Sequence, residues 1–273
     1  MNKRFLAILL FVISFYPFGV MANDSEATIA AGGLELVNNK DISIESEDLY
    51  ISEDIIKVNY IFKNNSDKDI KTLVAFPLAP ILEIAEDEYD GNVEVNADNP
   101  VNFYVTVNKK PVKFKIERKK NKDNSINIKY YWEQTFPANK FTKVFHRYQP
   151  VMGGWFVCEP REDDSCETDL TKFNNEYCVS KDLGKWMKKT WASRSNGEYS
   201  SLLMLKNIVY ILKTANNWSG PIKDFKLKIE KPSKNAKLSY CFPGSVDKNS
   251  PTTYEIKRKN FVPEKDLDIV ILE

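Results

Sequence analysis

Apolar and polar residues alternate with a period of two along many short stretches of this chain, and this pattern decides what it can fold into. The clearest stretch has apolar residues at every second position: Ile56, Val58, Tyr60 and Phe62. The residues between them are polar, except Ile61. Because side chains of a strand point alternately to its two faces, this stretch predicts a half-buried strand. Strands are also predicted at residues 72–76, 103–107, 112–116, 126–132, 141–148, 225–229, 238–242, 252–257 and 267–272.

Turn signals separate these strands, and together they indicate a mostly β protein. Asn64-Asn65-Ser66-Asp67 and Pro137-Ala138-Asn139 are such turns. Many short strands with one polar face are typical of an antiparallel β-sandwich rather than of a buried parallel sheet. Residues 202–213 fit a helix or a strand, and their β-branched and aromatic content near 208–211 favours a strand there.

A change in composition at Gly153-Gly154 predicts two sandwich-like lobes, residues 23–150 and 151–273. Residues 158–178 hold three cysteines and few aliphatic residues, so we interpret them as a disulfide-held loop. One short helix is predicted at about 181–192, with Ser180 as its cap and Asp182 in its first turn.

Residues 1–22 have the features of a secretory signal peptide. Lys3 and Arg4 precede an apolar run that is too short for a comfortable membrane span, and Pro17 and Gly19 follow it. The sequence predicts cleavage after Ala22 and an exported, periplasmic product. An uncleaved N-terminal anchor is the alternative.

The charge balance excludes some partners. The chain has 39 basic and 38 acidic residues, which gives no reason to expect nucleic acid or anionic lipid as a partner. No apolar run after the signal peptide is long enough to span a membrane. We expect an envelope protein or a small ligand as the partner.

All four cysteines lie after the predicted cleavage site, and an even count in an exported protein favours disulfides. Of the three possible pairings we favour Cys158–Cys166 with Cys178–Cys241. Free or metal-bound thiols are the alternative, but one histidine and no CxxC pair make zinc a poor fit. We therefore expect no metal and no cofactor.

Candidate catalytic residues are few. His146 is the only histidine, so any Ser-His-Asp or Cys-His mechanism needs it. Its place in an alternating strand favours a half-buried structural histidine that is hydrogen-bonded to backbone. The acidic residues near 45–54 offer hard-cation ligands, but they lack the spacing of a known calcium loop.

Two tryptophans are candidates for a ligand or partner surface together with His146. Trp218 lies in the turn Asn217-Trp218-Ser219-Gly220-Pro221, where it has the chemistry to stack on a ligand or to cover the end of the core. Trp155 and its neighbour Phe156 offer an apolar patch for a partner, or packing between the helix and the sheet.

The mature start, residues 23–34, resembles the opening of the uncharacterised bacterial family DUF4424. Later blocks that match this family are residues 46–52, 74–78, 146–150, 153–154, 177–178, 217–222, 225, 241, 250–252, 261–263 and 266–267. The resemblance covers nearly the whole mature chain and implies an exported bacterial protein without an established activity. The Cys158–Cys166 loop departs from the family pattern.

These observations predict a non-enzymatic binding or interaction module of the cell envelope, because the sequence shows no convergent set of nucleophile, base and metal ligands. A periplasmic hydrolase that uses carboxylates or His146 is the alternative. Exposed aromatic residues beside a groove or a free strand would favour the binding module, and a deep pocket that holds His146 would favour the enzyme.

Overall fold

The structure is a computed structural model that describes residues 24–30, 33–82, 92–159, 170–193, 202–242 and 247–273. These ranges contain eighteen β-strands, two α-helices and one 3-10 helix, so the predicted mostly β class is confirmed. The predicted signal peptide and Cys166 lie outside the described residues.

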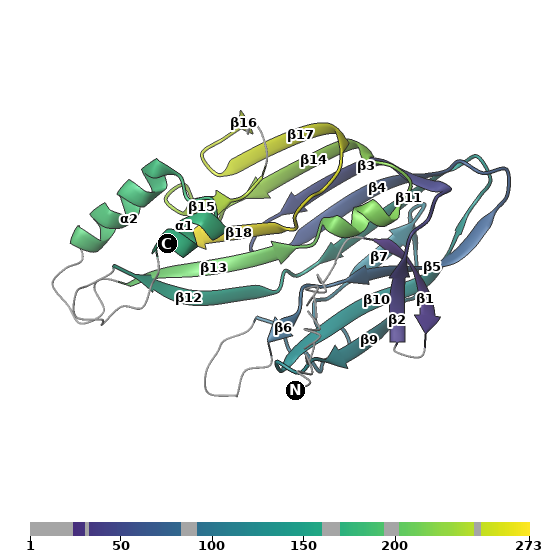
Figure 1. Ribbon diagram of the computed structural model, residues 1–273, viewed down its shortest axis with the longest axis horizontal. Coiled ribbons are helices and arrows are strands. Elements are labelled where there is room, and N and C mark those ends of the chain that lie inside the picture. Colours follow the sequence, from purple (N-terminus) through teal and green to yellow (C-terminus); the bar gives the residue numbers. More distant parts are fainter. Residues whose placement is uncertain (1–23, 31–32, 83–91, 160–169, 194–201, 243–246) are drawn as a thin grey trace, which may run out of the picture.

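Three sheets form the molecule (Figure 1). A six-stranded sheet has the order β2-β1-β5-β10-β6, and β9 also pairs with β10. Its strands are β1 (Ser25–Ala30), β2 (Gly33–Val37), β5 (Ile70–Pro77), β6 (Ile81–Leu82), β9 (Lys115–Lys120) and β10 (Ser125–Phe136). A four-stranded sheet has the order β12-β13-β18-β15; its strands are β12 (Met152–Cys158), β13 (Leu202–Tyr210), β15 (Lys237–Tyr240) and β18 (Leu267–Leu272).

The eight-stranded sheet has the order β16-β17-β14-β3-β4-β11-β7-β8. Its strands are β3 (Ile42–Ile51), β4 (Ile56–Asn64), β7 (Tyr104–Val107), β8 (Lys110–Pro111), β11 (Phe141–Tyr148), β14 (Ile222–Glu230), β16 (Asp247–Lys248) and β17 (Thr253–Phe261). All its pairs are antiparallel except β3 with β14, which is parallel.

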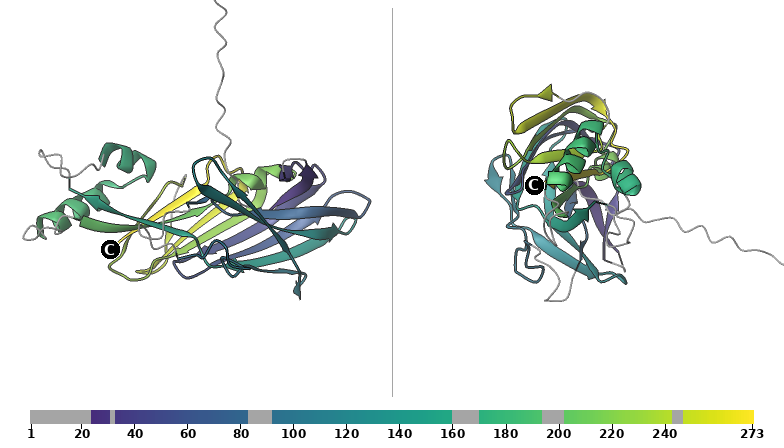
Figure 2. Two further views of the ribbon diagram at one scale, coloured as in Figure 1. Left: turned by 90° about the horizontal axis from the view of Figure 1, so that it is seen from below. Right: turned by 90° about the vertical axis from the view of Figure 1, so that its left-hand side faces the viewer.

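One apolar core joins the inner faces of the three sheets, which curve around it (Figure 2). Phe62 of the eight-stranded sheet contacts Phe136 of the six-stranded sheet, with ring centres 5.7 Å apart. Tyr60 contacts Tyr210 of the four-stranded sheet through their hydroxyls. Each fully buried large apolar side chain contributes about 1.5–3 kcal/mol, so this shared core holds the sheets together.

A second cluster covers the other face of the four-stranded sheet, at the end of the molecule where α1 (Leu170–Glu176) and α2 (Lys181–Ser193) lie (Figure 1). Leu183, Met187 and Trp191 form the buried stripe of α2. The predicted cap is confirmed, because the Leu183 amide donates to Ser180 Oγ at 3.1 Å.

Three local predictions need correction. Helix α1 lies in the segment that we expected to be a loop; its buried Phe173 and the buried Tyr177 are four residues apart, a helical spacing that the surrounding polar residues obscured. The strand favoured near residues 208–211 is present but begins earlier, since β13 covers Leu202–Tyr210, which excludes the helix alternative there; the 3-10 helix η1 (Lys213–Asn217) follows. Finally, the chain returns along β7 only through β8 and the Val112 amide, which donates to the Val105 carbonyl, and from Lys115 onward β9 pairs with β10 instead.

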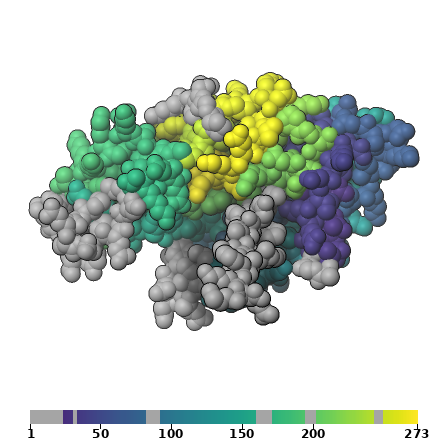
Figure 3. All heavy atoms as spheres, in the orientation of Figure 1, coloured from purple at the N-terminus to yellow at the C-terminus, as the bar shows by residue number. Residues whose placement is uncertain are grey.

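Segments from the two ends of the chain lie against each other (Figure 3). The indole of Trp218 donates to the Asp24 carbonyl, and the Asn217 amide donates to Ser25 Oγ at 2.9 Å. The lobe boundary predicted near residue 150 stays a prediction, and strands from both sides of that position share the eight-stranded sheet.

The structure contains the favoured disulfide Cys178–Cys241. It joins the residue just after Tyr177 to the end of β15, which lies at an edge of the four-stranded sheet. A disulfide fits an extracytoplasmic compartment. None of the helices in the described ranges has the length and apolarity needed to span a bilayer.

Candidate functional site

The outer face of the eight-stranded sheet carries most of the chemistry that the structure exposes. Strand alternation puts Glu47, Leu49 and Ile51 of β3 in the core and turns Asp48 and Tyr50 outward. The same alternation along the neighbouring strands turns eight cations and four carboxylates outward: Lys57, Lys63, Lys143, Arg147, Lys226, Lys228, Lys257 and Lys259 with Asp48, Asp224, Glu230 and Glu255.

Most of these cations form no close ion pair, although Lys63 and Lys226 attract the carboxylates of Glu45 and Glu255. Lys257 pairs with Glu255 and Lys259 pairs with Asp224. Across the residues that the structure describes, the other six cations form no ion pair with a carboxylate. The outer face is therefore positive, although basic and acidic residues nearly balance over the whole chain.

Five outward residues form a row across five neighbouring strands, which we name the cation–aromatic ladder: Lys228, Tyr50, Lys57, Arg147 and Tyr104. Each is the register partner of the next. The Nζ atoms of Lys57 and Lys228 lie 5.3 Å and 5.6 Å from the centre of the Tyr50 ring. The Arg147 guanidinium lies 5.1 Å from the centre of the Tyr104 ring. Cation–π attraction thus holds three cations in fixed positions.

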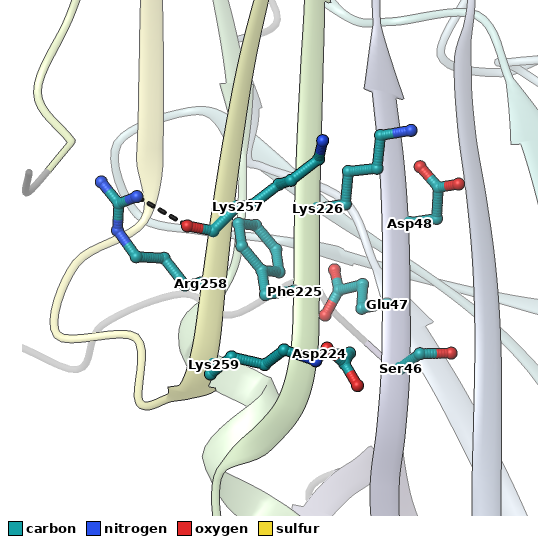
Figure 4. Close-up of a pocket in the computed structure, with 9 residues that line it drawn as sticks. All are labelled: Ser46, Glu47, Asp48, Asp224, Phe225, Lys226, Lys257, Arg258 and Lys259. Atoms are coloured by element: carbon teal, nitrogen blue, oxygen red, sulfur yellow. Dashed lines mark hydrogen bonds and ion pairs between the residues drawn. The ribbon is translucent and has the colours of Figure 1, made fainter. Parts of the chain in front are cut away.

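A groove of about 470 Å³ lies beside the ladder, over β3, β14 and β17 (Figure 4). Six of its nine lining residues belong to the outer face: Ser46, Asp48, Asp224, Lys226, Lys257 and Lys259. The other three, Glu47, Phe225 and Arg258, alternate with them along the same strands. The groove is thus an exposed depression on the sheet and not an enclosed catalytic cavity.

A polar cluster lies in the core beneath this sheet. His146 Nε2 is 3.4 Å from Asp24 Oδ2, and both side chains are 0 % exposed. Four aromatic rings surround His146, with centres 5.1–5.6 Å from its own: Tyr60, Phe76, Phe103 and Trp132. Nearby, the Tyr210 hydroxyl donates to the buried carboxylate of Glu47 at 3.4 Å.

Burial favours the uncharged forms of both members of the His146–Asp24 pair. Removal from water lowers the pKa of His146 to about 3. Burial, followed by the charge of Glu47, raises the pKa of Asp24 well above its ordinary value. Burial also raises the pKa of Tyr60 and Tyr210, with Glu47 adding to the effect. Burial thus favours the protonated form of the Asp24 carboxyl group and the uncharged form of the His146 imidazole.

We expect opposite pH effects from the two members of this pair. Below pH 6.5 the unfolded chain protonates His146 and the folded chain does not until about pH 3, so acidification lowers the free energy of unfolding. Asp24 has a raised folded pKa, so its contribution is lost as the pH rises from about 4. Each effect is at most about 1.4 kcal/mol per pH unit.

Urea unfolding of His146→Gln and Asp24→Asn between pH 4 and pH 7 checks this. Relative to wild type, the free energy of unfolding of His146→Gln should increase as the pH falls. That of Asp24→Asn should increase, relative to wild type, as the pH rises. Parallel pH profiles for the three proteins would contradict the assignment of the protonation states.

The structure separates the three residues that the sequence put forward as a ligand or partner surface. His146 and Trp218 are buried, and only Trp155 is exposed, at 38 %. Trp155 packs near Tyr177, and its neighbours in the sheet include the exposed Phe156 and Met204. We expected a half-buried His146 bonded to backbone, whereas its ring is fully buried and its Nε2 lies 3.4 Å from the Asp24 carboxylate.

Sequence reasoning missed the ladder. Its residues are distant in the chain, and each strand alone shows only the ordinary lysines of a solvated face. The signal that was available is the pairing of Tyr50 and Lys57 around a short turn, because hairpin neighbours face each other across strands. The parallel pairing of β3 with β14, which adds Lys228, carries no local signal.

Comparison with protein-family models settles the family. The domain of unknown function DUF4424 matches residues 22–125 and 118–270, which is most of the chain. The chain belongs to the DUF4424 family. A comparison of this DUF4424 protein with curated protein sequences gives no match.

Comparison with solved structures gives a fold likeness for the first of the following three proteins. A Legionella pneumophila protein named "putative nutrient binding protein" aligns with a TM-score of 0.57 at 17 % identity, over 92 % of this chain and 70 % of that one. Yeast LTA4 hydrolase aligns with a TM-score of 0.37 at 10 % identity, over 85 % of this chain and 28 % of that one. The M1 zinc metallopeptidase of Deinococcus radiodurans aligns with a TM-score of 0.34 at 8 % identity, over 86 % of this chain and 43 % of that one. The chain spans less than half of either enzyme.

Proposed function

We propose that this protein is a non-enzymatic binding module of the periplasm that captures an anionic ligand on the outer face of its eight-stranded sheet. The observation that carries the proposal is the set of six outward cations that form no ion pair with a carboxylate of the described residues. Unneutralised cations on one face attract anions and speed their association. Export through the signal peptide is part of the proposal, and the disulfide Cys178–Cys241 supports it.

The alternative, a hydrolase that depends on His146, has less support. A general base must reach a substrate, and His146 is 0 % exposed among four aromatic rings. Its lowered pKa also makes it a weak base at neutral pH. The fold likeness to a protein named for nutrient binding agrees with a binding role, without indicating which ligand this chain takes.

Charge reversal on the outer face tests the proposal. We expect the double variant Lys57→Glu and Lys228→Glu to elute from immobilised heparin, used as a generic polyanion, at a clearly lower salt concentration than wild type. The matched control is Lys188→Glu with Lys189→Glu, which makes the same charge change on exposed positions of α2. Equal losses in the two double variants would mean that net charge and not this face determines binding, and would overturn the proposal.

A further inference from the structure

We propose that the anionic ligand is a linear acidic polysaccharide that lies across the strands, along the cation–aromatic ladder. This inference rests on the proposed function and names its ligand class. Lys228, Lys57 and Arg147 lie on three strands of one register row, with β3 between the first two. At the usual spacing between strands, the row from Lys228 to Arg147 spans about 14 Å. A single small anion cannot reach all three cations, whereas a chain of charged units can.

The aromatic rings prepare these cations for binding. Lys57 and Lys228 lie over the ring of Tyr50, and Tyr50 itself is held by a hydrogen bond to Glu230 at 2.8 Å. Long side chains that are already positioned lose less conformational entropy when a ligand binds. The ladder is therefore better suited to binding than the scattered lysines of an ordinary solvated sheet.

The types of cation favour a ligand with several spaced charges rather than a single, tightly bound anion. Seven of the eight outward cations are lysines, which act as point charges, and only Arg147 offers a planar fork for one carboxylate or phosphate. A site for one phosphate group typically converges several donors on one point. Here the donors are spaced along a row, which matches an acidic group on each of several successive units.

Neutral polar groups next to the ladder favour sugar over other polyanions. Asn59, Ser46 and Thr106 face outward among the charges, where they can bond to sugar hydroxyls. A single-stranded nucleic acid needs free ring faces for base stacking, but cations cover the rings of Tyr50 and Tyr104. A membrane surface is favoured by apolar side chains that can insert, and none belongs to the ladder.

The groove extends the ladder on the β17 side. Lys226 and Lys257 are register partners in its lining, one row away from Lys228. Figure 4 shows these two lysines arising from adjacent strands, with Asp48 on the next strand. The ladder row itself meets Glu255 on β17, which pairs with Lys257, so a chain that crosses the ladder can continue one row away over Lys226.

A length series tests this inference. Isothermal titration calorimetry with oligogalacturonates, from the monomer to the octamer, should show affinity rising by a factor of ten or more and then reaching a plateau once the chain spans the ladder. Monomer and octamer of equal affinity would overturn the polysaccharide, as would binding of phosphatidylglycerol vesicles or single-stranded DNA in preference to the octamer. If heparin retention still depends on Lys57 and Lys228 in any of these cases, the proposed function stands without this ligand.

A variant without charge change tests the role of the rings. Tyr50→Leu should weaken octamer binding roughly five- to ten-fold, because it removes the anchor of two lysines. The matched control is Phe156→Leu, at an aromatic residue exposed on a different sheet. Tyr104→Leu, which removes the ring beneath Arg147, serves if Tyr50→Leu lowers the melting temperature. Full affinity in folded Tyr50→Leu and Tyr104→Leu would overturn the ladder as the binding row.

Discussion

Trp218→Ala should lower the free energy of unfolding by about 3–5 kcal/mol, because it removes a large buried side chain and leaves a cavity. Trp218 is 3 % exposed and packs against Phe62 and Phe136, with ring centres at 5.0 Å and 5.9 Å. Its indole also donates to the Asp24 carbonyl at 2.6 Å. The loss of this donor from a buried carbonyl adds to the destabilisation.

Two further variants separate packing from hydrogen bonding. Trp218→Phe keeps most of the ring contacts and should cost only about 1–3 kcal/mol for the lost donor. Trp155→Ala removes the same residue type from an exposed strand and should cost about 1 kcal/mol or less. Urea titrations of the three variants give these values. Similar losses in Trp218→Ala and Trp155→Ala would contradict the assignment of Trp218 to the core.

The turn around Trp218 shows why only part of this result could be predicted from the sequence. The turn signal was visible, and the second role proposed for Trp218, covering the end of the core, agrees with its burial. Its partners were not visible, because Asp24 and Ser25 lie almost two hundred residues earlier in the chain. Ser219 also donates its amide to the Ile42 carbonyl, at the start of β3. Such long-range contacts depend on strand order, which periodicity does not encode.

The positions of several strands could be predicted from the sequence for a physical reason. Which strands pair with each other could not. In β4 and β11 one face is buried and the other is solvated, so the side-chain period of two appears directly in the sequence. In β3 the mixture of Glu45, Glu47 and Asp48 looked like a set of solvated carboxylates. In the structure Glu45 pairs with Lys223 and Glu47 is buried near Tyr210, so tertiary contacts explain these acidic residues.

The outer face of the eight-stranded sheet also depends on strand partners that the sequence does not reveal. Each outward lysine is typical of a solvated strand, and no sequence pattern distinguishes any of them from an ordinary surface lysine. Their concentration on one surface depends on the order β17-β14-β3-β4-β11, which brings together strands from both ends of the chain. Near neutrality of the whole chain therefore concealed a positive face.

Replacing both Cys178 and Cys241 with serine should lower the free energy of unfolding by about 4 kcal/mol. The bond closes a loop with a sequence separation of 63, and the chain-entropy model gives that value for a loop of this length. The affected region is the cluster of α1, α2 and the four-stranded sheet, since Tyr177 meets β15 through its carbonyl, which accepts from Ser239 Oγ at 2.8 Å.

Single variants provide the control for this expectation. Cys178→Ser and Cys241→Ser each abolish the same bond, so each should cost nearly as much as the double variant, and the two losses should not add. Denaturant titrations of the three proteins, monitored by the fluorescence of Trp191 and the other tryptophans, measure these losses. Additive single losses, or a double variant within 1 kcal/mol of wild type, would show that the bond does not constrain the unfolded chain as the loop length implies.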